Sequence, residues 1–124
     1  MTLDFTKCDG LVPVIVQDHH DGRVLMLGFM NEEAFGKTVE SGKVTFYSRT
    51  RNTLWTKGET SGHHLQVKRI EVDCDLDTLL VHAVAFGPGV CHAGFRSCFY
   101  RRLDGEAWVR HKEPSYDPAS VYGS

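Results

Sequence analysis

The chain has 124 residues, enough for one domain with its own hydrophobic core and too few for two. Hydrophobic residues make up 41%, charged residues 24%, and the formal net charge is −2, which is ordinary for a soluble globular protein. No apolar run approaches the roughly 20 residues of a membrane span, and the chain is not basic enough for bulk nucleic-acid binding. The N-terminus has no basic region followed by an apolar segment, so we expect a cytoplasmic protein.

The first third of the chain predicts a hairpin followed by one helix. Apolar runs at 11–16 and 24–29 flank a turn with an Asp-Gly signal, in which His19 and His20 are expected to be solvated. Pro13 restricts the first run to an edge strand or a strand start, because proline cannot donate a ladder hydrogen bond. Asn31 is a good N-cap, and Gly42 is placed to end the helix.

The remainder predicts short strands separated by turns, at 43–48, 54–57, 65–72, 78–86, 99–103 and 107–109. This number of short elements with one helix indicates a mainly β fold on the border of α+β. We expect a compact, barrel-like sheet capped by the helix. Residues 1–112 are predicted to form the single domain. Residues 113–124 form a polar tail with two prolines, which we expect to be frayed.

Three cysteines indicate a metal site. Cys74, Cys91 and Cys98 lie close together in the sequence, and thiolates are soft ligands that suit zinc. Three thiolates without an obvious fourth protein ligand favour a catalytic zinc with an open position. The alternative is three buried structural thiols, since free cysteine packs as a small hydrophobic residue. Cys8 lies far away and is expected to be a lone thiol.

Three aspartates surround the first of these cysteines. If the segment is extended, Asp73, Asp75 and Asp77 share one face, with Cys74 on the other. Carboxylates that close repel one another unless a cation neutralises them, and clustered carboxylates suit magnesium. The alternative is a polar face with its acids in water.

Other residues suggest a base and an anionic substrate. His92 follows the second cysteine, and its ordinary pKa suits a general base beside a zinc-activated water. Zinc deaminases, some with three cysteine ligands, attack a purine carbon in this way. Residues 41–70 carry six basic side chains and one acidic one, which suggests a phosphate ester, although a solvated face would look the same. The phosphate-binding candidates are Arg49, Arg51, Lys57, Ser61 and Arg96.

Three blocks, YSRTRNTLWTKGETSGHH, VDCDLDTLLVHAV and GPGVCHAGFRSCFYR, resemble the phosphoribosyl-AMP cyclohydrolase family over about residues 14–103. The resemblance implies that Cys74, Cys91 and Cys98 bind zinc and that His92 takes part in catalysis. It further implies that Asp73, Asp75 and Asp77 bind magnesium. It also implies an intertwined homodimer of small, largely β protomers, with each zinc site formed between the two chains.

The activity implied by this resemblance is the third step of histidine biosynthesis. A zinc-activated water opens the purine six-membered ring of N1-(5-phosphoribosyl)-AMP at the N1–C6 bond, giving the formimino-carboxamide ribonucleotide. The chain length matches a stand-alone form without a fused pyrophosphohydrolase. Two other functions stay open. One is a zinc-dependent purine nucleotide aminohydrolase, which would release ammonia. The other is a non-catalytic zinc-stabilised binding module, which would need a fourth ligand to close its site.

Overall fold

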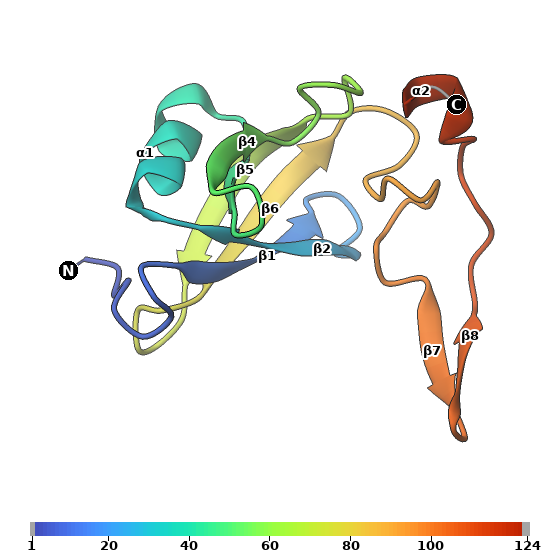
Figure 1. Ribbon diagram of the computed structural model, residues 1–124, viewed down its shortest axis with the longest axis horizontal. Coiled ribbons are helices and arrows are strands. Elements are labelled where there is room, and N and C mark those ends of the chain that lie inside the picture. The colour runs from blue at the N-terminus through green and yellow to red at the C-terminus, as the bar shows by residue number, and fades with distance from the viewer. Residues whose placement is uncertain (1, 123–124) are drawn as a thin grey trace.

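The computed structural model describes residues 2–122 and shows a mainly β protein with two short helices (Figure 1). Its elements in chain order are β1 (Val12–Asp18), β2 (Val24–Met30), α1 (Glu32–Ser41), β3 (Thr45–Ser48), β4 (Thr53–Thr56), β5 (Leu65–Val72), β6 (Leu79–Ala85), β7 (Arg101–Asp104), β8 (Ala107–Arg110) and α2 (Ala119–Tyr122). The predicted strands are confirmed, with shifts of one to two residues at most of their ends. The four-residue helix α2 was not predicted.

The main sheet has four strands in the order β2-β1-β6-β5. The two inner strands, β1 and β6, are parallel, and each outer strand is antiparallel to its neighbour. Pairing between β1 and β6 starts at Val14 opposite Leu79, so Pro13 lies just before it. A missing N–H at this position removes no bond to β6, and the prediction of a strand start is confirmed.

The core lies on one face of this sheet. Alternate residues of β1 (Val12, Val14 and Val16) are fully buried, as are Val81 and Ala83 of β6. Each fully buried valine- or leucine-sized side chain contributes about 1.5–3 kcal/mol through removal of apolar surface from water. Two parallel inner strands packed in this way form the rigid centre from which the loops extend.

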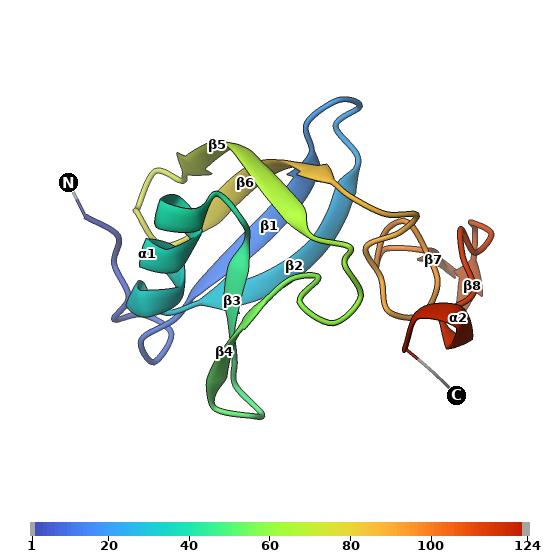
Figure 2. The ribbon, with the colours of Figure 1, turned by 90° about the horizontal axis from the view of Figure 1, so that it is seen from above.

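Helix α1 begins and ends where the sequence predicts. Asn31 is the N-cap, and its side-chain oxygen accepts a hydrogen bond from the Ala34 amide at 2.8 Å. Gly42 ends the helix in the left-handed conformation with φ 75°, which a residue without Cβ adopts at no steric cost. The helix packs beside β3 and the main sheet (Figure 2).

The predicted barrel does not form. The strands lie in three open sheets, because β3–β4 and β7–β8 are separate two-stranded ribbons. One isolated bridge, Lys43 to Gln66, joins the segment before β3 to β5. A closed barrel requires every strand to be paired on both sides. Turn signals in the sequence give the number of strands. Closure of a barrel depends on which strands pair with one another, and the sequence pattern does not specify that.

The C-terminal third differs from the rest. The β7–β8 ribbon projects from the body (Figure 1), and all eight residues of its two strands are exposed. The tail that follows was expected to be frayed, but the Ser115 amide donates to the Gly94 carbonyl at 2.8 Å. The tail returns to the body through this contact. No helix in the described part of the chain is long and apolar enough to span a membrane.

Candidate active site

The loop that follows β6, residues 87–98, holds two of the three cysteines and is called here the cysteine loop. It begins at Gly87, where φ is 98° and a Cβ atom would lie 2.4 Å from the ring of His63, so only glycine fits. The loop is tight. The Val90 amide donates to the Arg96 carbonyl and the Cys91 amide to the Phe95 carbonyl, both at 3.0 Å. This fold brings Cys91 and Cys98 together.

The two thiols form a suitable half of a zinc site. Burial, together with the neighbouring Cys91, raises the pKa of Cys98 to about 12, although the positive charge of Lys57 acts in the opposite direction. A cation between the two sulfur atoms would lower this pKa, because metal binding favours the thiolate over the thiol. The donors therefore fit a soft divalent cation such as zinc.

A polar cleft of about 410 Å³ lies beside the cysteine loop. Its lining residues are Arg51, Trp55, Thr56, Lys57, Gly58, Glu59, Thr60, Ser61 and His92. Thus the structure brings His92, exposed on the loop, together with three of the predicted phosphate-binding residues: Arg51, Lys57 and Ser61. Lys57 is unusual among them because only 8% of it is exposed. Such a cleft suits an anionic ligand.

The other two predicted phosphate-binding residues lie elsewhere. The Arg49 guanidinium is 4.1 Å from the centre of the Phe29 ring. Arg96 forms ion pairs with Asp18, the last residue of β1, at 3.3 Å and with Asp21 of the following turn at 2.8 Å. Neither arginine lines the cleft, and the sequence pattern that suggested them does not separate residues of the cleft from residues of the surface.

The three aspartates converge. One carboxylate oxygen from each of Asp73, Asp75 and Asp77 lies within 4.8 Å of the others. The segment is not extended, however, because β5 ends at Val72 and the next residues form a turn, with Leu76 at φ 64°. The Asp73 carboxylate accepts hydrogen bonds from the amides of Asp77 at 3.0 Å and Thr78 at 3.1 Å, which fixes this turn. We call residues 73–78 the aspartate turn.

A lysine from the N-terminal segment partly neutralises the turn. The Lys7 ammonium lies 3.1 Å from Asp77 and 3.2 Å from Asp75. The hydrogen bond from Lys7 lowers the pKa of Asp77, but the neighbouring carboxyls of Asp75 and Asp73, together with burial, give a net increase. Repulsion of this kind is relieved when a cation binds. No sequence pattern indicated this contact.

Cys74 does not lie near the other two cysteines. It is exposed in the aspartate turn, at the opposite end of β6 from the cysteine loop (Figure 1). A seven-residue strand is about 20 Å long, far beyond the reach of one metal ion. Among the described residues, the aspartates form the only group of three or more potential ligands close enough to share an ion. One chain therefore provides two thiols at one end of β6 and one at the other.

Tyr116 and His63, which the sequence analysis did not single out, pack against the cysteine loop. The Tyr116 hydroxyl, from the tail, donates to the Cys91 carbonyl at 2.7 Å. The Tyr116 ring packs edge-on against His63, with the ring centres 5.2 Å apart. The His63 side chain is buried, and its Nδ1 has no hydrogen-bond partner within the described chain. A proline-containing polar tail gives no local signal for such a contact.

Comparison with known proteins gives a consistent result. Residues 26–100 match the family described as phosphoribosyl-AMP cyclohydrolase. A phosphoribosyl-AMP cyclohydrolase of Solibacter usitatus is 61% identical over 123 residues, which cover 99% of this chain and 98% of the relative. The proteins of the same name from Desulforapulum autotrophicum and Geobacter metallireducens are 51% and 49% identical. The comparison with the Desulforapulum protein covers 97% of both chains. The comparison with the Geobacter protein covers 97% of this chain and 96% of the relative.

Proposed function

The chain belongs to the phosphoribosyl-AMP cyclohydrolase family, whose members are hydrolases of histidine biosynthesis. From this premise we propose a specific reaction and an active site formed by two chains. The reaction is hydrolytic opening of the N1–C6 bond in N1-(5-phosphoribosyl)-AMP. The observation that carries the proposal is the position of His92 and of the Cys91–Cys98 pair beside a cationic cleft, with the third cysteine at the far end of β6.

Zinc is held by Cys91 and Cys98 of one subunit and Cys74 of the other. When bound, zinc supplies the Lewis acidity that makes water a nucleophile near neutral pH. The separation of Cys74 from the cysteine loop supports the shared arrangement, because one chain is unable to close the site. In a two-fold dimer the arrangement is reciprocal, so there are two equivalent sites, one at each end of the interface.

His92 acts as the general base. Its imidazole is exposed at the edge of the cleft, where it accepts a proton from the attacking water. Substitution at N1 makes C6 of the purine electrophilic, and the water oxygen adds there. When the N1–C6 bond breaks, its electron pair goes to N1 and the proton held by His92 is transferred to the same nitrogen. The proton that remains on the added oxygen moves to the exocyclic nitrogen, so C6 becomes the carboxamide carbon, and both phosphoribosyl groups are retained.

The cleft binds the phosphorylated substrate. Lys57 and Arg51 provide positive charge. Ser61 lies in the loop 58–62, which is bounded by glycines and directly follows Lys57. Gly58 allows this loop to pack closely, because a Cβ atom there would lie 2.3 Å from the His64 amide. Arginine gives paired hydrogen bonds to phosphate oxygens, and a buried lysine gives a fixed point charge.

Magnesium is held by Asp73, Asp75 and Asp77. Their converging oxygens are the hard ligands that magnesium prefers. Because these aspartates flank Cys74, the partner that contributes the third thiolate also brings its aspartate turn to the cleft. The second chain thus supplies both the last zinc ligand and the magnesium ligands.

The reaction is tested by the absorbance change of purified protein with phosphoribosyl-AMP, with and without a zinc chelator. Ring opening should be lost with the chelator and return with added zinc. It should release no ammonia, whereas an aminohydrolase would release one equivalent. A zinc-stabilised binding module would show no turnover at all, and either result would exclude the proposed reaction.

The shared site is tested by mixing two inactive variants. Cys74→Ser and Cys98→Ser proteins, unfolded together and refolded, should recover about a quarter of wild-type activity, because half of randomly paired dimers are mixed and each has one intact site of two. The matched control is a mixture of Cys91→Ser and Cys98→Ser proteins. Those lesions affect the same loop, so no mixed dimer has an intact site. Recovery equal in both mixtures, or in neither, would refute the shared site.

A further inference from the structure

The β7–β8 ribbon, residues 101–110, carries two largely exposed apolar side chains on one face, which they share with the Arg101–Arg110 pair at the base of the ribbon. Leu103 pairs with Trp108 across the ribbon, so both side chains lie on the same face, and they are 58% and 69% exposed. Arg102 and Val109 form a pair on the opposite face. A lone two-stranded ribbon is marginally stable in water. This face is therefore expected to pack against another surface.

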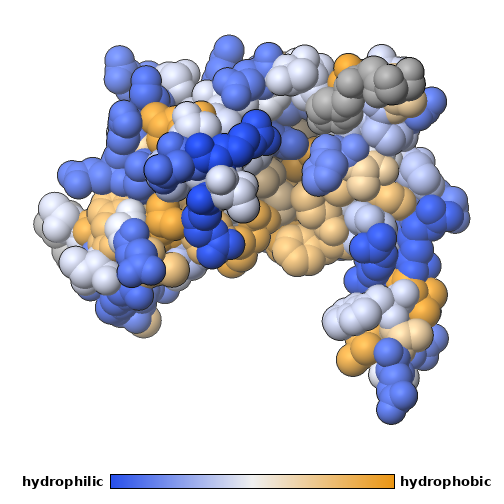
Figure 3. Space-filling model, viewed as in Figure 1, coloured by the Kyte–Doolittle hydropathy of each residue, from blue (hydrophilic) through white to orange (hydrophobic). Residues whose placement is uncertain are grey.

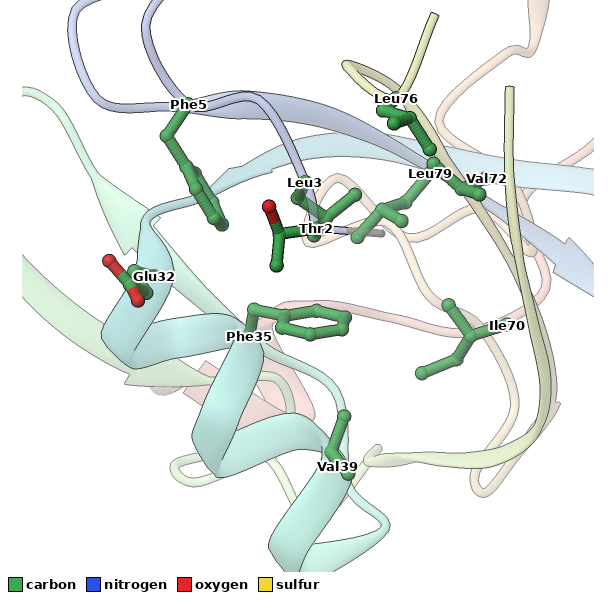
Figure 4. Close-up of a pocket in the computed structure, with 10 residues that line it drawn as sticks. All are labelled: Thr2, Leu3, Phe5, Glu32, Phe35, Val39, Ile70, Val72, Leu76 and Leu79. Atoms are coloured by element: carbon green, nitrogen blue, oxygen red, sulfur yellow. The ribbon is translucent and has the colours of Figure 1, made fainter. Parts of the chain in front are cut away.

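An apolar cavity of about 680 Å³ lies at the other end of the molecule. Side chains from the N-terminal segment, from α1, from β5 and from the aspartate turn point into it (Figure 4). The lining residues are Thr2, Leu3, Phe5, Glu32, Phe35, Val39, Ile70, Val72, Leu76 and Leu79. Val39 and Val72 are 59% and 45% exposed, so the cavity is open to a partner. Exposed apolar side chains gathered from several elements in this way are typical of an interaction surface.

We propose that the Leu103–Trp108 face of each subunit packs into this cavity of the other subunit. The inference rests on the proposed shared zinc site, which fixes how the two chains meet. Val72 and Leu76 lie two residues from Cys74, and β7 begins three residues after Cys98. If Cys74 and Cys98 of different subunits share an ion, the base of each ribbon must lie beside the cavity of its partner.

Shape and charge agree with this placement. The ribbon projects from the body at one end, and the elements that line the cavity, the N-terminal segment, α1 and β5, lie at the other (Figure 1). A four-residue strand reaches about 13 Å. Hydrophobic surface is also exposed on the body beside the projecting ribbon (Figure 3). Residues 101–112 carry four cationic and two acidic side chains. Glu32 is the only charged residue among the described lining residues of the cavity, and the aspartate turn lies beside it.

The contact is tested by placing a photo-crosslinking amino acid, p-benzoylphenylalanine, at position 108 of ¹⁵N-labelled protein mixed with unlabelled protein. Crosslinks should join position 108 to residues 32–39 or 70–79 of the chain with the other label. The matched control places the same group at position 109, on the opposite face, and should give few such products. Crosslinks from position 108 that stay within one chain, or reach another part of the partner, would overturn the proposal.

Dimer affinity gives a second measurement. The double variant Leu103→Asp with Trp108→Asp should raise the dimer dissociation constant at least about 30-fold in sedimentation experiments, since interface tryptophans carry much of the binding energy. Val39→Asp on the cavity side should raise it at least about 10-fold, and Val109→Asp by less than about 3-fold. An equal effect of Val109→Asp and of the Leu103→Asp, Trp108→Asp double variant would contradict the model of one buried face.

The two proposals fail in different ways. Recovery of activity by mixed Cys74→Ser and Cys98→Ser subunits, together with crosslinks that miss the cavity, would refute only the ribbon contact. Absence of recovery would refute the shared zinc site, and with it the reasoning that places the ribbon at the cavity.

Discussion

The two ends of β6 have contrasting chemistry. At its start lies the aspartate turn, exposed and acidic, held by its own amide hydrogen bonds and by Lys7. At its end lies the cysteine loop, with Cys91 buried and the tail bonded to it through Tyr116. Each end carries part of the proposed metal sites, and the strand between them is paired on both sides. Because this strand keeps the two parts apart within one chain, assembly of the proposed zinc site requires a second chain.

The largest effect should come from removing a zinc ligand at either end. Cys74→Ser, Cys91→Ser or Cys98→Ser should each lose zinc, measured by atomic absorption, and lose activity to background. Cys8→Ser should retain both, because Cys8 is exposed in the N-terminal segment and is no part of the proposed ligand set. Loss of zinc from the Cys8 variant, or its retention in the Cys74 variant, would contradict the assignment of ligands to both ends.

The next largest effect belongs to the cysteine-loop end alone. His92→Ala should lower turnover by about 10²- to 10⁴-fold, the usual contribution of a general base. Zinc content and folding should not change, because His92 is exposed and its loss leaves no cavity. His92→Gln is a useful companion variant, since it retains a polar side chain but is unable to accept the proton. Near-normal turnover in either variant would remove His92 from the mechanism.

At the aspartate-turn end, Asp75→Asn should raise the magnesium concentration for half-maximal activity by about 10-fold or more, because a charged ligand is replaced by a neutral one. Asp77→Asn should act in the same direction. Zinc content should stay constant in both. If zinc falls instead, the aspartates support the zinc ligands and the two ends are less separate than proposed.

A smaller effect is expected where the tail meets the cysteine loop. Tyr116→Phe removes the hydroxyl that bonds to the Cys91 carbonyl, and a neutral hydrogen bond is worth about 1 kcal/mol, or about 5-fold in zinc affinity. Competition with a chelator measures this affinity. Tyr47→Phe is the matched control, because its hydroxyl bonds to Asn52 in the β3–β4 turn and not to the cysteine loop. Equal losses in both variants would show that the effect is not local to the loop.

The smallest effect should have the opposite sign. Lys7→Met removes the ammonium that occupies the aspartate turn, so magnesium should bind without displacing it. The magnesium requirement should fall by about 2- to 5-fold, the range expected for an exposed ion pair. Titration of activity with magnesium measures this change. A rise in the requirement would mean that Lys7 organises the aspartates and does not compete with the ion.

The sequence by itself determined the local features. The cap at Asn31, the left-handed Gly42 and the positions of the strands follow from short-range hydrogen bonds and side-chain periodicity, and the structure agrees with each. The sequence predicted that Asp73, Asp75 and Asp77 share one face of an extended segment, whereas the turn after β5, with Leu76 at φ 64°, brings their carboxylates together. The kinds of ligand were also readable from the chain, because thiolates and carboxylates have fixed metal preferences.

Only the tertiary structure decided the relations between distant segments. It opened the predicted barrel into three sheets, placed Arg49 and Arg96 outside the cleft, and bonded the tail to the cysteine loop. It also showed that Cys74 and Cys91, 17 positions apart in the sequence, lie at opposite ends of one strand. The physical reason is that strand order and loop placement depend on packing between distant residues, for which capping, turn and periodicity signals carry no information.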